Sequence, residues 1–318
     1  MVLHIVYLIA GGLFLWKGAD WVVDSASAIA RRFGISELVI GLTIIAMGTS
    51  LPEFLVTLTA ALKGIPSISF ANIVGSNIFN LCIILGAVAI LHSVSGSKTL
   101  LTRDIPFLFG IELLTRVFAS NGSLSRWNGM ILFGLFVGYL VWMYLRCKGV
   151  SKIAEQAVDE SEVESIEPAT KKDYLLLPLG LLAVSFGSQF VVDGASGLAR
   201  GFGISEWAIG VTIVAAGTSL PELVTCLSAA TKGKGDMVLG NLIGSDFFNF
   251  AGVLGLTSIL QPIAIKQTEL LNMNIAVLVV LLIWLIIKTQ GRISRAEGGL
   301  LLGIGLARWG MEIWRLAG

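Results

Sequence analysis

The chain has 318 residues, of which 55% are hydrophobic and only 14% are charged, and its mean hydropathy is +0.85. Soluble domains carry about 25% charged residues, so this composition excludes a soluble protein and indicates one that crosses a membrane many times. The net charge of +1 excludes a basic nucleic-acid footprint, and two histidines and three cysteines are too few for a zinc site or a disulfide framework.

Apolar segments between clusters of charge predict ten membrane-spanning helices. A bilayer core of about 30 Å requires about 20 apolar residues per helix. The segments that meet this requirement are, in chain order, 3–28, 35–61, 68–91, 104–120, 127–146, 174–199, 205–231, 236–260, 268–288 and 296–314. Runs such as residues 176–185 lack the alternation of a β-barrel strand. The predicted fold class is therefore an all-α membrane protein.

The distribution of basic residues predicts the orientation of the chain. Cytoplasmic loops collect Lys and Arg. With the N-terminus outside, the inside loops hold 14 of the 22 basic residues and the outside loops hold seven, which favours both termini outside. Residues 151–172 are polar with six acidic side chains, and they predict a solvated cytoplasmic linker over 147–173. The linker separates two predicted five-helix domains, residues 1–146 and 174–318.

The two halves of the chain repeat each other. Residues 34–53 and 203–222 are identical at 15 of 20 positions, and the same offset aligns 72–80 with 241–249. The matches include Gly, Thr, Ser, Pro, Glu and Asn, which chance similarity between two apolar helices would not produce. Each half holds an odd number of spans, so the second half enters the membrane from the opposite side. Two inverted five-helix repeats are a transporter architecture, with the substrate site at the repeat interface near mid-bilayer.

The sequence GTSLPE lies in the middle of one predicted span of each half, beginning at Gly48 and at Gly217. Pro52 and Pro221 lack an N–H and clash with the carbonyl four residues back, so they break the helix and free the carbonyls of the two glycines. Irregular backbone at membrane depth is tolerated only where it is buried in protein or lines a cavity. The neighbouring carbonyls that gain a route to a ligand are those of Ala46, Thr49, Ala215 and Thr218.

A carboxylate follows each proline, Glu53 in the first half and Glu222 in the second. A carboxylate at mid-membrane costs at least about 2.5 kcal/mol, and neither broken segment contains a Lys or Arg to pair with it. The carboxylates, the freed carbonyls and four hydroxyls form an all-oxygen cage; the hydroxyls belong to Thr49, Ser50, Thr218 and Ser219. Hard cations such as Ca²⁺ and Na⁺ prefer oxygen ligands, and the two negative charges match one Ca²⁺.

Further polar residues are repeated on the span that follows each GTSLPE segment. Two pairs have the spacing i, i+4 and so share one helix face: Ser76 with Asn80, and Ser245 with Asn249. Asn77 and its counterpart Asp246 lie one residue further round, beside that face.

GTSLPE and GSN-x-x-N, duplicated in inverted halves of five spans, resemble the α-repeats of the cation/calcium exchanger superfamily and of its prokaryotic sodium/calcium exchangers in particular. The resemblance covers nearly the whole chain. It implies ten transmembrane helices and alternating access of Na⁺ and Ca²⁺ to one site, without a cofactor. It also implies that Glu53 and Glu222 are shared Ca²⁺ ligands, with carbonyls from Thr49 and Thr218 and with Asn80 and Asn249 at the centre. The flanking Na⁺ positions implied are Ala46, Ser50, Ser76, Ala215, Ser219 and Ser245.

The chain departs from the family pattern at two places. Some members carry an acid where this chain has Asn80 or Asn249, and two amides make a dependence on K⁺ or on a proton at that position less expected. Asp246 stands where the first half has Asn77 and adds a carboxylate just off the expected site. This carboxylate either shifts ion selectivity or faces a water-filled entrance.

The predicted function is antiport of Na⁺ against Ca²⁺. More than two Na⁺ would overcompensate the two glutamates, so the cycle would be electrogenic. Spans 1 and 6, which are long and contain Gly18 and Gly187, are the predicted moving pair. Ca²⁺/H⁺ exchange is the alternative on the same scaffold, because a proton can replace Na⁺ on either glutamate. A cation channel is the alternative from another class, but an inverted repeat within one chain favours a site that is occluded and switched.

The remaining predictions concern chemistry, partners and location. The chain contains no Ser/His/Asp set, HExxH or GxSxG motif, so an enzyme is not predicted. The predicted partners are Ca²⁺, Na⁺ and the lipid bilayer, with no nucleic acid, and the chain is predicted to act as a monomer. Its compact form favours a multi-pass protein of a prokaryotic plasma (inner) membrane.

Overall fold

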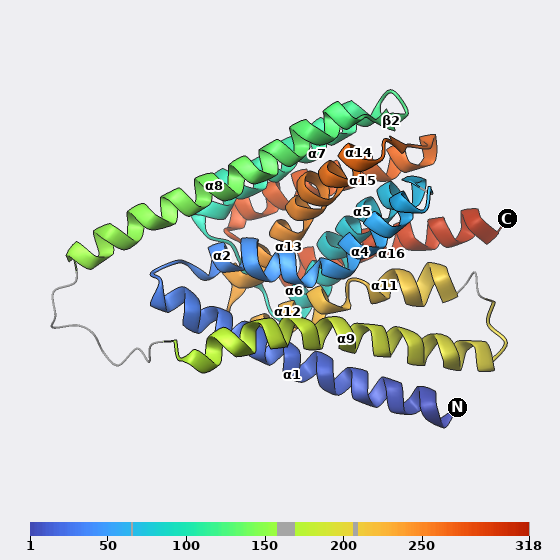
Figure 1. The fold of residues 1–318 in the computed structure, drawn as a ribbon, viewed down its shortest axis with the longest axis horizontal. Coiled ribbons are helices and arrows are strands. Elements are labelled where there is room, and N and C mark those ends of the chain that lie inside the picture. The colour runs from blue at the N-terminus through green and yellow to red at the C-terminus, as the bar shows by residue number, and fades with distance from the viewer. Residues whose placement is uncertain (65, 158–168, 206–208, 318) are drawn as a thin grey trace.

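The computed structural model describes residues 1–64, 66–157, 169–205 and 209–317. It is a bundle of helices that places both termini at one end of the molecule (Figure 1). The C-terminal end of α8 (Arg126–Ala157) and the N-terminal end of α9 (Lys171–Gly201) lie at the opposite end. Helical structure thus extends into the 147–173 segment from both sides, and residues 158–168 lie outside the described residues.

The first half is built from helices joined by short π-helical segments, which are labelled η. In chain order they are α1 (Val2–Arg32), α2 (Glu37–Ile40), η1 (Gly41–Ile45), α3 (Ala46–Thr49), α4 (Leu51–Leu62), α5 (Pro66–Ile78), η2 (Phe79–Ile84), α6 (Leu85–Leu91), η3 (Leu100–Asp104), α7 (Ile105–Ala119) and α8. The second half follows α9 with η4 (Gly210–Val214), α11 (Ala215–Gly217), α12 (Leu220–Thr231), α13 (Gly235–Phe247), η5 (Phe248–Leu254), α14 (Gly255–Leu260), α15 (Gln267–Gln290) and α16 (Arg295–Ala317).

Six described helical segments are long and apolar enough to cross a membrane, and a bent helix pair over 37–62 brings the number to seven. The six are Val2–Arg32, Ile68–Leu91, Arg126–Arg146, Lys171–Gly201, Gly235–Leu260 and Gln267–Gln290. The other predicted spans fall short by length or by charge, since α7 has 15 residues, α12 has 12, and α16 carries several charged side chains. The fold is therefore helical and of the membrane type, and the count of ten spans stays a prediction.

Four two-residue strands were not expected from the sequence, and they tie the two halves together. β1 (Val94–Ser95) pairs antiparallel with β4 (Arg292–Ile293), and β2 (Ser123–Leu124) pairs with β3 (Ile263–Ala264). Each pair joins a loop of the first half to a loop of the second half. The two strand pairs thus link the halves at two places outside the long helices.

Both GTSLPE segments lie at a helix break. Ser50 separates α3 from α4, and the helix axis bends there by 48°. Ser219 occupies the same place between α11 and α12, and the proline is the second residue of the following helix in both halves. The π-helical segments repeat as well, because η1 and η2 in the first half correspond to η4 and η5 in the second. Such π-helical insertions occur frequently at functional sites.

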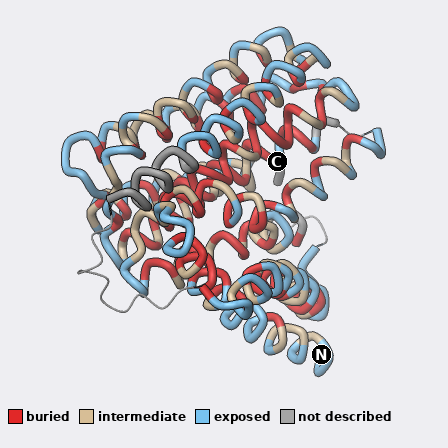
Figure 2. The backbone as a smooth tube through the Cα atoms, turned by 60° about the vertical axis from the view of Figure 1, so that its left-hand side comes forward, coloured by how far each residue is buried: buried red, intermediate tan, exposed pale blue. Residues whose placement is uncertain are grey.

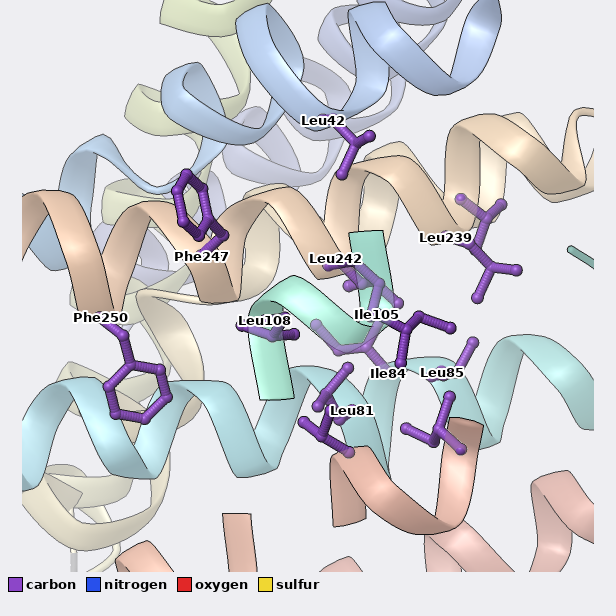
Figure 3. Close-up of a cluster of buried hydrophobic side chains, with 14 of the residues drawn as sticks. Leu42, Leu81, Ile84, Leu85, Ile105, Leu108, Leu239, Leu242, Phe247 and Phe250 are labelled. Atoms are coloured by element: carbon purple, nitrogen blue, oxygen red, sulfur yellow. The ribbon is translucent and has the colours of Figure 1, made fainter. Parts of the chain in front are cut away.

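The core of the molecule lies along the span that contains α5 and α6 and the span that contains α13 and α14. In their most apolar windows 72% and 83% of the residues are buried, against 22% for α1 and 28% for α8. Figure 2 shows the buried residues gathered on the inner helices and the exposed ones on the outer helices. Figure 3 shows part of this core, where Leu81 and Ile84 approach Ile105, Leu108 and Leu242. The central spans therefore form a rigid frame for the polar residues they carry.

Helices α1 and α9 form a closely packed pair beside this core. A Cβ atom added at Gly11 would lie 2.7 Å from the carbonyl oxygen of Gly187, and one added at Gly18 would lie 3.0 Å from that of Gly180. Small residues let helix backbones approach this closely inside a membrane. The pair has its own small buried cluster, separate from the main core.

Candidate functional site

The two helix breaks bring Glu53 and Glu222 into the interior, where both side chains are fully buried. The hydroxyl of Ser50 donates to Oε1 of Glu222 at 2.7 Å, and the hydroxyl of Ser219 donates to Oε1 of Glu53 at 2.8 Å. Each half thus holds the carboxylate of the other half. The four residues come from positions that match in the two repeats, and the contact between them is reciprocal.

The local sequence explains why a carboxylate can stand at this depth. Ser50 and Glu53 have the spacing of a capping box, as do Ser219 and Glu222, and each glutamate lies in the first turn of its helix. The unpaired N–H groups and the dipole of a helix N-terminus favour negative charge there. Neither serine caps its own helix, because both hydroxyls are used across the repeat interface.

One oxygen of each carboxylate remains free. Oε2 of Glu53 and Oε2 of Glu222 are buried and have no hydrogen-bond partner among the described residues. No Lys or Arg of the described chain pairs with either glutamate, and the charge of Glu222 acts directly on Glu53. Two adjacent buried negative charges require a compensating positive charge. The free oxygens therefore offer a place for a cation.

Three further residues predicted for the site, Ala46, Thr49 and Ser245, lie together and are fully buried. The hydroxyl of Ser245 lies 3.4 Å from the carbonyl oxygen of Ala46, which it meets as a donor. The hydroxyl of Thr49 lies 3.2 Å from Oδ1 of Asn241. The sequence prediction missed Asn241, although it is repeated as Asn72 and could have been found from the repeat. Asn72 and Asn241 contact matching positions on α4 and α12, Thr57 and Cys226.

Two of the three equivalent residues, Ala215 and Thr218, are more accessible, while the third, Ser76, is buried. Ala215 is exposed, and it lines a cavity of about 180 Å³ together with Ser76 and the ion pair of Arg308 and Glu312. Thr218 is partly buried and lines a larger, mostly apolar cavity of about 830 Å³ against α9. This second cavity is also lined by Gly48, Pro52 and Gly217 of the helix breaks and by Ser188 of α9. Ser188 donates to the carbonyl of Gly217, which is the carbonyl that Pro221 frees.

A ring of amides surrounds Asp246 next to the glutamates. Asn80 donates to Oδ1 of Asp246 at 3.2 Å, and Asn77 donates to its backbone carbonyl at 3.2 Å. Asn249 donates to Oδ1 of Asn77 at 2.8 Å, which closes the link between the two halves. Asp246 is fully buried in this conformation, and its role stays a prediction.

The donor set is suited to a cation that passes through. Among the described residues no group of three or more His, Cys, Asp or Glu could hold a metal ion. The ligands available are two carboxylates with hydroxyl, amide and carbonyl oxygens, which hard cations prefer. Such a set can bind Na⁺ or Ca²⁺ as cargo.

The comparisons with known proteins agree with this chemistry. The family model described as "Sodium/calcium exchanger protein" matches residues 3–145 and 172–304. The sodium/calcium exchanger MaX1 of Methanosarcina acetivorans is 32% identical and the match covers 95% of this chain and 96% of that protein. The inner membrane protein YrbG of Escherichia coli is 32% identical over 99% of this chain and 98% of its own. A solved structure of the sodium-calcium exchanger NCX_Mj, soaked with zero Na⁺ and Ca²⁺, is 34% identical with a TM-score of 0.84 and coverage of 96% and 97%.

Proposed function

Because the chain belongs to the sodium/calcium exchanger protein family and is an antiporter of Na⁺ and Ca²⁺, we propose that exchange takes place at Glu53 and Glu222. The observation that carries the proposal is the reciprocal contact of the two glutamates with Ser219 and Ser50. It leaves one free buried oxygen on each carboxylate. One Ca²⁺ between these oxygens neutralises both charges.

The other ligands follow from the same geometry. Thr49 and Thr218 contribute backbone carbonyls to the Ca²⁺ position, since the helix breaks beside them interrupt the regular hydrogen bonding. Na⁺ occupies flanking positions formed by Ala46, Ser50, Ser76, Ala215, Ser219 and Ser245. Asn80 and Asn249 complete the centre, and their free amide oxygens support that role.

The proposed architecture is ten membrane-spanning helices in two inverted five-helix repeats, residues 1–146 and 174–318. It is supported by the matched positions of the helix breaks, the π-helical segments and the strands in the two halves. In this architecture α7, α12 and α16 also cross the membrane as parts of spans. The limited length of α7 and α12 is accommodated because a π-helical segment precedes α7 and a broken helical segment precedes α12.

The proposed location is a prokaryotic inner membrane, with both termini outside, the central linker in the cytoplasm and a monomer as the working unit. The basic residues support this orientation, and Figure 1 shows the two termini at the same end. The open cavities beside Ala215 and Thr218 then face outside, and the sealed residues Ala46 and Thr49 face the cytoplasm. The structure corresponds to an outward-facing state of an alternating-access cycle.

The exchange is tested by uptake of radioactive Ca²⁺ into proteoliposomes loaded with Na⁺, K⁺ or choline, with and without a pH gradient. We expect uptake that depends on the outward Na⁺ gradient and that is lost in Glu53→Gln and in Glu222→Gln. A membrane potential should alter the rate, because more than two Na⁺ for one Ca²⁺ moves net charge. Uptake that ignores Na⁺ and follows the pH gradient would instead assign the chain to proton-coupled exchange.

A further inference from the structure

An ion pair lies on the wall of the cavity of about 180 Å³ that Ser76 and Ala215 line. Arg308 and Glu312 are one turn apart on α16, inside a predicted span, and they are the only charged residues among the described residues that line this cavity. Ionisable side chains inside a membrane are costly, and they commonly mark the route of an ion. The pair is therefore a candidate for a role in ion binding.

Helix α16 is packed against the span that contains α5 and η2, which fixes the place of the ion pair. The ring of Trp309 meets that of Phe79 edge-on, with the ring centroids 6.0 Å apart. A Cβ atom added at Gly305 would lie 2.8 Å from the Cβ of Cys82, so the two backbones approach closely. The wall that carries the pair therefore belongs to the packed interior of the bundle.

The two charges differ in exposure. The side chain of Arg308 is 12% exposed, and that of Glu312 is 36% exposed. Nε of Arg308 also donates to Oδ1 of Asn272 on α15 at 3.4 Å, so a second helix holds the guanidinium. The positive charge is thus the more enclosed member of the pair, and the negative charge lies nearer to solvent.

The cavity adjoins the exchange site through Asn72, which also lines it. The amide of Asn72 donates to the backbone carbonyl of Glu53 at 3.4 Å. A cavity of this volume holds only a handful of water molecules, so the charges on its wall are weakly screened. A cation held beside Ala215 is therefore repelled by Arg308 and attracted by Glu312.

The ion pair has no counterpart in the first half of the chain. The offset that aligns the repeat motifs matches Arg308 with Tyr139 and Glu312 with Met143. Tyrosine and methionine carry no charge at neutral pH. The pair therefore distinguishes the proposed Na⁺ position on this side from its counterpart in the other half.

We propose that Arg308 and Glu312 set the Na⁺ affinity of the position at Ser76 and Ala215. Arg308 weakens Na⁺ binding there and Glu312 strengthens it. Both act on the ion through the cavity, and neither is a ligand. This inference rests on the proposed function, which assigns Na⁺ to that position. A weaker Na⁺ position releases its ion more readily, which a site that alternates between Na⁺ and Ca²⁺ requires.

The two roles are tested by equilibrium binding of radioactive Na⁺ to the purified full-length chain in the absence of Ca²⁺. We expect Arg308→Gln to lower the Na⁺ concentration for half-saturation by about threefold or more, and Glu312→Gln to raise it by a similar factor. The variant with both changes should fall between the two single variants. Arg308→Lys keeps the positive charge and should bind Na⁺ like the unaltered chain.

Opposite shifts separate this role from a structural one, because loss of the ion pair as a structural contact would affect both single variants in the same direction. Shifts in the same direction, or no shift, would overturn the inference. If Arg308→Gln folds poorly, Glu312→Gln and Arg308→Lys still decide.

Arg116→Gln is the matched control. Arg116 lies in the last turn of α7 and donates from Nε to Oδ1 of Asn274 on α15 at 2.6 Å, much as Arg308 does to Asn272. It is not among the described residues that line the cavity. Its replacement should leave Na⁺ binding unchanged.

The outcome is separable from that of the proposed function. Na⁺-driven Ca²⁺ uptake, and its loss in Glu53→Gln, decide whether the repeat glutamates carry exchange. Unshifted Na⁺ binding in Arg308→Gln and Glu312→Gln, in a chain whose uptake follows the Na⁺ gradient, would overturn only the roles of the ion pair. Uptake that ignores Na⁺, together with absence of Na⁺ binding, would overturn the proposed function and this inference with it.

Discussion

The two halves of the chain have nearly the same sequence around the site, yet they pack differently. Gly244 on α13 is crowded, since a Cβ added there would lie 2.6 Å from the Cα of Leu42. Its counterpart in the first half, Gly75 on α5, has no atom within 4 Å of the same position. Ala46 is accordingly buried, while its counterpart Ala215 is exposed. Matching sequences that adopt one tight and one loose packing can exchange these roles, and that exchange is what alternating access requires.

The same asymmetry extends to the contacts of α1 and α9. Lys232, which follows α12, pairs with Asp20 and Asp24 of α1 at 3.0 and 2.8 Å. Its counterpart Lys63, which follows α4, is exposed and forms no ion pair within the described part of the chain. The counterpart of Asp24 is Asp193, which accepts a hydrogen bond from Gln189 of its own helix. On the closed side Lys232 thus forms ion pairs with α1, whereas Lys63 forms no corresponding ion pair with α9 among the described residues.

The largest effect is expected from replacing either repeat glutamate, and it should be the same in the two halves. Glu53→Gln and Glu222→Gln each remove a buried charge that faces the same cation, which costs about 3 kcal/mol or more. We expect each to lower the affinity for Ca²⁺ by at least about 100-fold, by isothermal titration and by uptake. Glu269→Gln, a change at the start of α15 away from the site, is the control. A variant that keeps normal Ca²⁺ affinity would show that its half does not contribute a ligand.

A cross-link that prevents the halves from exchanging roles should abolish transport but spare binding. The hydroxyl of Ser228 on α12 lies 2.8 Å from Oδ1 of Asp20 on α1, so cysteines at these two positions can be joined by a short thiol reagent. In a chain without its three native cysteines, we expect loss of Ca²⁺ uptake after cross-linking and recovery after reduction. Uptake that continues in the cross-linked chain would exclude α1 as a moving element.

Substitutions at the matching glycines Gly75 and Gly244 test the difference in packing between the two halves. Gly244→Ala places a methyl group against the backbone of η1, and overpacking of this kind costs about 1–3 kcal/mol, so we expect a lower melting temperature. Gly75→Ala meets open space, so the melting temperature should be unchanged. Transport by Gly75→Ala should nevertheless slow severalfold, because the opposite state would bring backbone against that methyl group. Equal thermal effects at the two glycines would mean that the two sides are packed alike.

Sequence was sufficient for the family and for a helical membrane fold, because the repeated GTSLPE segment combines a helix breaker with a buried acid that few other contexts tolerate. It could not reveal that Ser50 and Ser219 bond to the opposite half. Their spacing to Glu53 and Glu222 is that of a local capping box, and only the inverted packing exchanges the partners. The sequence also did not single out Glu112, a fully buried acid of α7, because it stands alone in an apolar segment with Leu281 at the matching position of the second half.

Sequence also cannot say which side is open. Gly75 and Gly244 are identical residues in matching motifs, and Lys63 and Lys232 likewise. The difference between them is a property of one conformation, and it would be reversed in the other.

The smallest expected effect comes from removing the ion pairs of Lys232 with Asp20 and Asp24. Lys232 is partly exposed, and ion pairs of this kind are worth at most about 1 kcal/mol, so Lys232→Gln should shift the balance between the two states only severalfold. The shift is read from the rate at which an Ala215→Cys thiol reacts with a water-soluble reagent, since Ala215 is exposed in the present state. We expect slower labelling in Lys232→Gln and an unchanged rate in Lys63→Gln, because Lys63 forms no ion pair with any residue that the structure describes.

The pH dependence of this labelling follows from the same contacts. Burial lowers the pKa of Lys232, but hydrogen bonds from Lys232 to Asp24 and Asp20 and their negative charges outweigh it, so the pKa is raised above its ordinary value of 10.5. A lysine with a raised pKa keeps its ion pairs at every pH below the ordinary value and loses them only as the pH rises through the raised one. The difference in labelling rate between Lys232→Gln and the unaltered chain should therefore be constant from neutral pH up to the ordinary lysine pKa of 10.5, and it should disappear only as the pH rises through the raised pKa of Lys232. If the difference in labelling rate already vanished near neutral pH, the titrating group that stabilises the present state would not be Lys232. It would be another group, such as the carboxylates that Lys232 contacts.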